Sequence, residues 1–141
     1  MKASARIAAV PDGRGGTRLA TLHGESPLLL RRTGARSAAG AAGAAGAAGA
    51  AGAAGAVTVH LVGGAAGPLR GDDLRLDITV GPGAALEVRS VAAQLALPGR
   101  AGLPPSRLQI TAEVAAGGTL RWLPEPLIAA AGCAHVTVTR I

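Results

Sequence analysis

Apolar and polar residues alternate with a period of two over most of the chain, as in strands that bury one face. The clearest case runs from Leu74 to Val80, where aliphatic residues alternate with arginine, aspartate and threonine. Gly81-Pro82-Gly83 interrupts this pattern, and the alternation resumes from Leu86 to Val88. The order predicts two strands joined by a tight turn, which is a β-hairpin.

The same unit recurs downstream, because residues 74–90 align without gaps on residues 108–124. Leu74 then meets Leu108, and a looser version of the unit surrounds residues 12–16. Recurrence of one unit indicates layers in which each unit lends its apolar face to the next. We therefore expect an all-β protein, with repeated β-hairpins stacked in a two-layer or solenoid-like β-fold.

The last arm, residues 136–141, begins another alternating pattern and has no returning strand after it. A strand without a neighbour exposes backbone hydrogen-bonding groups, which invite pairing with another strand. We expect residues 1–141 to form a single, incomplete β domain, whose last edge is completed either by further chain or by a partner.

Residues 38–56 contain only alanine and glycine and interrupt the strand pattern. Glycine at every third position matches collagen, but collagen also needs abundant proline. A helix would contain six glycines, each costing about 0.8–1 kcal/mol relative to alanine, and it would have no apolar stripe to pack. We interpret the run as a low-complexity insertion that forms a disordered loop.

Composition narrows the function classes. Trp122 is the only aromatic residue of the 141, so the core must be aliphatic. Residues 1–36 hold seven basic and two acidic residues, and therefore +5 of the net charge of +6. Arginine suits carboxylate partners, although a coding bias towards alanine, glycine and arginine also explains the excess. Nucleic acid is disfavoured, because single-strand binders stack bases on aromatic side chains.

The sequence also bears on location. Cys133 is the only cysteine, which excludes an internal disulfide and fits a reducing compartment. The apolar stretch at residues 7–10 ends at Pro11 and is too short for a signal peptide. No apolar run reaches the length that crosses a bilayer. We expect a cytoplasmic protein without a membrane partner.

Cys133 and His135 form a candidate metal pair. Two residues apart on a strand, they would share a face, and a thiolate with an imidazole suits nickel or zinc. Two ligands leave the site incomplete, so His23, His60, an acidic residue or a second chain would have to contribute. The alternative is a small buried cysteine beside an incidental surface histidine.

Two further segments are candidates for binding. Gly71-Asp72 lies in a turn before the clearest strand, where ordinary turn chemistry is the alternative. Trp122-Leu123-Pro124-Glu125-Pro126 places two prolines around a carboxylate, and proline cannot continue a central strand. A stiffly held Glu125 suits a cation or a basic partner; the alternative is a tryptophan core plug followed by an exposed corner. Neither a phosphate-binding loop nor a serine nucleophile elbow is present, so nothing indicates an enzyme.

Three segments in order resemble the N-terminal half of the UreD (UreH) family of urease accessory proteins: SPLLLRRT, VHLVGGAAGPLRGDDLRLDITVGPGAALEVRSVAAQLALPG and SRLQITAEVAAGGTLRWLPEPLI. The resemblance implies a β-rich, non-enzymatic scaffold that binds apo-urease, joins UreF and UreG, and assists nickel insertion. It implies no permanent cofactor, with nickel bound only transiently. The family's Gly-Asp turn falls on Gly71 and Asp72, and its strand-end segment on Trp122, Leu123 and Pro124. Glu125 is then a candidate interior carboxylate on a nickel or water path.

A second function stays open beside this one. The arginine-rich first quarter fits a basic β-fold binding module for an acidic protein or nucleic acid.

The Ala-Gly run lies between SPLLLRRT and VHLVGG, which are neighbours in the family pattern. We therefore predict that deleting Ala38 to Gly55 leaves folding and partner binding nearly unchanged. Thermal unfolding and co-purification of the deleted and parent chains measure this. A large loss of solubility or binding would contradict it.

Overall fold

The computed structural model describes residues 1–34 and 55–141. The insertion expected at residues 38–56 therefore lies, except for its last two residues, outside the described residues. No helix in the described ranges is long and apolar enough to cross a bilayer.

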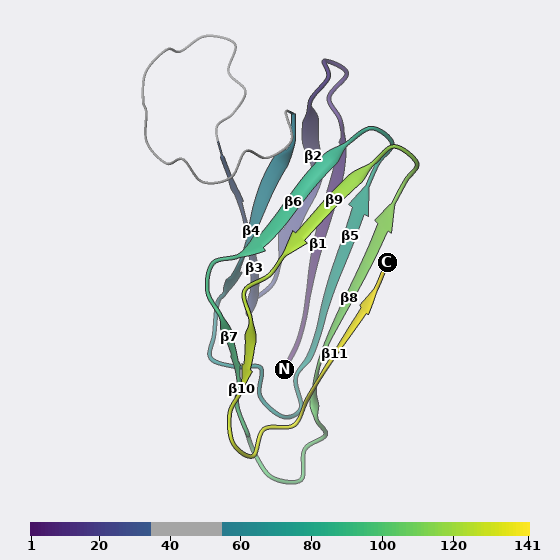
Figure 1. Cartoon of the computed structure of the whole chain (residues 1–141). Helices are drawn as coiled ribbons and strands as arrows, with labels where there is room; N and C mark the ends of the chain where they lie inside the picture. The colour runs from purple at the N-terminus through teal and green to yellow at the C-terminus, as the bar shows by residue number, and fades with distance from the viewer. Residues whose placement is uncertain (35–54) are drawn as a thin grey trace.

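The described residues fold into strands that form three sheets (Figure 1). Sheet A has the order β11-β8-β5-β1-β2, sheet B the order β3-β4-β6-β9, and sheet C pairs β10 with β7. The strands are β1 (Lys2–Pro11), β2 (Thr17–Gly24), β3 (Leu28–Thr33), β4 (Val57–Gly63), β5 (Asp73–Val80), β6 (Ala85–Ser90), β7 (Gln94–Ala96), β8 (Ser106–Val114), β9 (Thr119–Leu123), β10 (Leu127–Ala129) and β11 (His135–Arg140).

The protein is mainly β, as predicted, but the expected repetition of hairpins is wrong. β5 and β6 belong to different sheets; β5 pairs in parallel with β8, and β6 with β9. In Figure 1, β5 and β8 run upwards in sheet A, and β6 and β9 return downwards in sheet B. The connection at residues 81–84 crosses between the sheets, so the apolar faces of its two strands meet across the core. A hairpin would have placed both faces on one side of a single sheet.

The residues that align in the gap-free sequence repeat are the residues that lie opposite each other in these parallel strand pairs. Leu74 lies opposite Leu108 and Leu86 opposite Leu120, an offset of 34 residues in both pairs. The sheets as a whole are mixed, because β1–β2 and β3–β4 are antiparallel. They are therefore not those of a uniform solenoid. Only the first unit is the predicted hairpin, with Asp12 Oδ1 accepting the N–H groups of Arg14 at 2.7 Å and Gly16 at 2.9 Å.

The core lies between sheets A and B and is aliphatic. Trp122 is only partly buried and packs against this core from β9. The largest aliphatic side chains with less than 2 % exposure come from β1, β3, β4, β5 and β6: Ile7, Leu28, Val59, Leu74, Leu76, Ile78, Val80, Leu86 and Val88.

The last arm is not unpaired, which corrects the sequence expectation. β11 pairs in parallel with β8, with His135 opposite Ser106 and Arg140 opposite Thr111. Its other side is an edge of sheet A, just as β9 is an edge of sheet B and β10 an edge of sheet C. These three edges come from consecutive strands of the chain.

Truncation of a central core residue should test this packing. Leu76 is 0 % exposed and lies between Ala5 of β1 and Ile110 of β8. Leu76→Ala should lower the free energy of unfolding by about 2–5 kcal/mol, because it removes buried methyl groups and leaves a cavity. Urea unfolding measures the change. The matched control Leu95→Ala, at a side chain that is 44 % exposed, should stay within about 0.5 kcal/mol of the parent; equal losses would contradict the core.

Candidate functional site

Asp72 lies in a buried turn that joins three parts of sheet A. Its Oδ2 accepts the N–H of Leu69 at 2.9 Å, and its Oδ1 accepts the Met1 ammonium at 2.7 Å. Its carbonyl accepts the N–H of Arg107 at 2.7 Å. Gly71 has a φ of 86°, a left-handed conformation that glycine adopts without strain. These contacts are those of a structural anchor between β1, β5 and β8.

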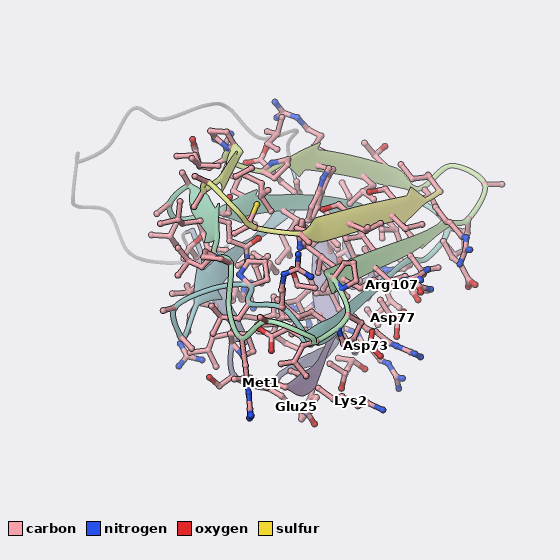
Figure 2. The ribbon with its side chains drawn as sticks, turned by 90° about the horizontal axis from the view of Figure 1, so that it is seen from below. Met1, Lys2, Glu25, Asp73, Asp77 and Arg107 are labelled. Carbon is pink, nitrogen blue, oxygen red and sulfur yellow. The ribbon has the colours of Figure 1, made fainter. Side chains whose placement is uncertain are left out.

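Beside this turn, the outer face of sheet A is a mosaic of opposite charges. Figure 2 shows Asp73, Asp77 and Arg107 close together on one side of the molecule. Arg75 lies 3.6 Å from Asp73. A shallow hollow of about 600 Å³ extends over this area and reaches Gly71 and Asp72.

His135 begins β11 and bonds through both ring nitrogens. Nδ1 lies 2.8 Å from Ser106 Oγ, and Nε2 lies 2.9 Å from Thr137 Oγ1. Ser106, at 0 % exposure, also donates to the Ala134 carbonyl at 3.2 Å. Its oxygen is then available to accept from Nδ1–H, while Nε2 accepts from the threonine hydroxyl. Burial lowers the pKa of His135 below its ordinary value of 6.5, so the neutral ring is favoured.

Cys133 does not share a strand face with His135, which corrects the geometry expected from their spacing. Cys133 lies in the turn before β11, and its N–H donates to the Ala130 carbonyl at 3.0 Å. A metal ion on His135 would have to replace Thr137 or Ser106. Over the described ranges, no group of three or more histidine, cysteine and acidic side chains is arranged to hold a metal. Metal binding by this pair stays a prediction.

Trp122 lines a mostly apolar hollow of about 320 Å³, which we call the inter-sheet hollow. Glu125 stands at its rim and is exposed, which corrects the expectation of an interior carboxylate. Its backbone N–H donates to Ser90 Oγ at 2.6 Å, which holds the loop against the end of β6. The hollow is lined by residues from all three sheets and the loops between them, including Leu61, Leu108, Ile110, Trp122, Pro124, Glu125, Leu127, Thr137 and Thr139.

The structure connects most of the candidate residues through β8 and β11. The Asp72 turn binds the second residue of β8, and His135 binds the first. Thr137 then joins His135 to the hollow that Trp122 lines. Only Cys133 stays outside this set of contacts.

Sequence reasoning missed Ser106 and Thr137. In the parallel register, Thr137 lies opposite Leu108 and Thr139 opposite Ile110, so the threonines share the face of buried leucine and isoleucine, although on this edge strand both threonines are exposed. Val136 is 46 % exposed on the other face. A Val-Thr alternation alone favours valine on the buried face, and no sequence signal reverses it. The offset between β8 and β11 is 29 residues (Ser106 opposite His135), and therefore differs from the earlier repeat.

The lowered pKa of His135 predicts a loss of stability on acidification. The unfolded chain binds the proton near pH 6.5, the ordinary value, whereas the folded chain binds it only at lower pH. Stability should therefore fall as pH falls through 6.5 towards the folded pKa. His135→Gln should flatten this dependence, measured by urea unfolding at about pH 7.5 and 5.5. His23→Gln, at an exposed side chain, is the control; equal slopes for parent and His135→Gln would contradict the assignment.

The sequence of this chain is similar to those of known proteins along essentially its whole length. The sequence model of the family described as "UreD urease accessory protein" matches residues 1–141. A protein of Frankia alni named urease accessory protein UreD is 52% identical over 146 residues, covering 99% of this chain and 46% of that protein. Its namesake from Streptomyces avermitilis is 45% identical over 141 residues, covering 100% of this chain and 49% of that protein.

The chain spans less than half the length of these relatives. Another relative, UreD 1 of Saccharopolyspora erythraea, is 38% identical over 99% of this chain and 48% of its own length. Because the family match and these similarities extend over essentially every residue, the chain belongs to the UreD family of urease accessory proteins.

Proposed function

We propose that this chain is a non-enzymatic accessory scaffold that acts in the cytoplasm during urease maturation. One observation carries the proposal: the family similarity extends over residues 1–141 rather than over a single motif. It includes the Asp72 turn, the two sheets and the inter-sheet hollow. The chain spans less than half the length of its relatives. That it performs the activity of these longer proteins is therefore itself proposed.

In this proposal the scaffold binds apo-urease together with UreF and UreG and assists nickel insertion. Nickel is cargo that passes along the protein, and no cofactor stays bound. The arrangement of Cys133 and His135 supports transient contact, because structural metal sites use about four protein ligands and catalytic ones about three. Two ligands in separate local environments hold an ion weakly and release it readily.

The inter-sheet hollow supplies the route that we propose for the ion. Glu125 at the rim offers a carboxylate for capture, and Thr137 offers a hydroxyl further along. Pro124 stiffens the loop that carries Glu125. Trp122 forms an apolar wall that offers the ion no ligand atoms and so does not retain it. Gly71 and Asp72 contribute by anchoring β8, which forms part of the same hollow.

Co-expression should separate the scaffold from the nickel route. The tagged chain, co-expressed with the urease subunits, UreF and UreG, should co-purify with them under gentle conditions. Purification of the chain alone from such cells would contradict the scaffold. Glu125→Gln should keep the complex but lower the nickel content of urease several-fold, measured by mass spectrometry of the metal. Glu113→Gln, an exposed carboxylate of β8 outside the hollow, is the matched control; equal nickel content in both variants would contradict the route.

A further inference from the structure

The outer face of sheet B carries a second candidate site, which we call the arginine face: Arg31, Arg89 and Arg121 with His60. The strand register places these side chains on one side of the sheet. Arg31 lies opposite His60, and His60 lies opposite Arg89. Arg121 of β9 lies opposite Glu87 of β6. Glu87 is two positions before Arg89 on the same strand, so the two point to the same side of the sheet. The core-facing residues Val59 and Val88 occupy the alternate positions, so the arginine face points away from the core.

A buried carboxylate orients two of the three guanidinium groups. Glu87 is only 3% exposed; its Oε1 pairs with Nε of Arg89, and its Oε2 lies 2.9 Å from Nη1 of Arg121. The arginine side chains themselves remain 31% and 40% exposed. One carboxylate therefore holds two cations in place while neutralising the charge of one. Such preorganised guanidinium groups lose little further freedom when they bind a partner.

Arg31 adds a cation that the described residues leave without a carboxylate. Its Nη1 donates to the Leu30 carbonyl at 3.2 Å, and within residues 1–34 and 55–141 it has no ion pair at 4 Å or less. A hollow of about 520 Å³ lies beside it, lined by Arg31, His60 and Arg89, with Glu125 also in the lining. Thr33 Oγ1 contacts Nδ1 of His60, which fixes the ring at the wall of this hollow.

Charge distinguishes this face from the outer face of sheet A. On sheet A, two exposed arginines lie at ion-pair distance from aspartates: Arg6 lies 4.0 Å from Asp77, and Arg75 lies 3.6 Å from Asp73. On the arginine face, Glu87 lies at ion-pair distance from Arg89 and Arg121, and Glu125 shares only the lining of the hollow with Arg31 and Arg89. Arg31 and Arg89 line this hollow, Arg121 lies outside its lining, and one carboxylate, Glu87, compensates two of the three cations.

The spacing of the cations favours a protein surface over a small anion. Neighbouring strands lie about 4.8 Å apart. Arg31 is on β3 and Arg121 is on β9, and β4 and β6 lie between these two strands, so the two strands are separated by about 14 Å. A single phosphate cannot reach across that distance, whereas several carboxylates of one protein can. Among the described residues, no phenylalanine, tyrosine or tryptophan side chain lines the hollow, so the ring of His60 is the one aromatic surface that its lining offers to a base. Arginine also binds carboxylates through paired hydrogen bonds.

We propose that the arginine face docks an acidic surface of a protein partner, with aspartate or glutamate side chains seated on Arg31 and Arg89. Glu125 repels carboxylates from its own part of the hollow and so restricts how the partner is oriented. The proposal deepens the scaffold function by naming the chemistry of the partner. It rests on the scaffold function only for the identity of the partner protein.

A charge-matched pair of variants tests the face with a deca-glutamate peptide as the probe. Arg31→Glu/Arg89→Gln removes cations at the hollow while glutamine keeps a donor for Glu87. Arg6→Glu/Arg75→Gln makes the same change of net charge on sheet A, at side chains that are 68% and 61% exposed. The peptide should bind the full chain at low salt, and the first variant should weaken binding about tenfold while the second weakens it at most about twofold. Equal weakening by both variants, or no binding to the parent, overturns the proposal.

Two further measurements keep the result specific. Equal thermal unfolding of the parent and the variants shows that each variant is folded. The single variant Arg31→Glu should give an intermediate loss of binding, and it leaves the ion pairs of the buried Glu87 intact. A single-stranded oligonucleotide of the same charge should bind more weakly than the peptide; tighter, hollow-dependent binding overturns the protein partner in favour of nucleic acid. Failure with the peptide leaves co-purification with urease unaffected, so the two proposals fail separately.

Discussion

The contact between the aliphatic faces of sheets A and B is the interaction on which the rest of the structure depends. A chain with a single aromatic residue must build its core from many small contributions, because leucine, isoleucine and valine bury less area than rings. Two facing sheets of alternating strands supply those contributions in regular rows. The connections at 81–84 and 115–118 matter because they carry the chain from one sheet to the other, so that β5 faces β6 and β8 faces β9 across the core.

This packing decides where polar chemistry is available. β8 lies between β5 and β11, so its first two residues receive the Asp72 turn on one side and His135 on the other. Beyond β8 this face is no longer buried: leucine and isoleucine on β8 are followed by the exposed Thr137 and Thr139 on β11. The inner face of sheet A therefore packs into the apolar core at the centre of the sheet. At the edge of the sheet the same face lines a partly polar hollow, with Trp122 as one wall.

The outer faces of the two sheets differ in how they treat charge. Sheet A pairs exposed arginines with half-buried aspartates, and such surface pairs add little stability. Sheet B buries Glu87 beneath two arginines, and a buried carboxylate is tolerated only when cations compensate its lost hydration. The structural need of one carboxylate therefore fixes two guanidinium groups in the same outward-facing region. A structural ion pair and a surface suited to acidic partners are, at this place, the same residues.

The sequence by itself determined that the chain is mainly β with an aliphatic core, because period-two alternation depends on local spacing. Its gap-free repeat gave the 34-residue offset, but the structure showed that this offset is the register of β5 with β8 and of β6 with β9. Its resemblance to the UreD family also agrees with the match over residues 1–141. Only the tertiary structure decided that the turn after Val80 crosses between sheets, that Glu125 is exposed, and that Ser106, His135 and Thr137 meet. A glycine-rich turn permits both a hairpin and a crossing, and the choice depends on which apolar face is available to cover the strand. That face belongs to residues distant in sequence, so the local pattern cannot contain the answer.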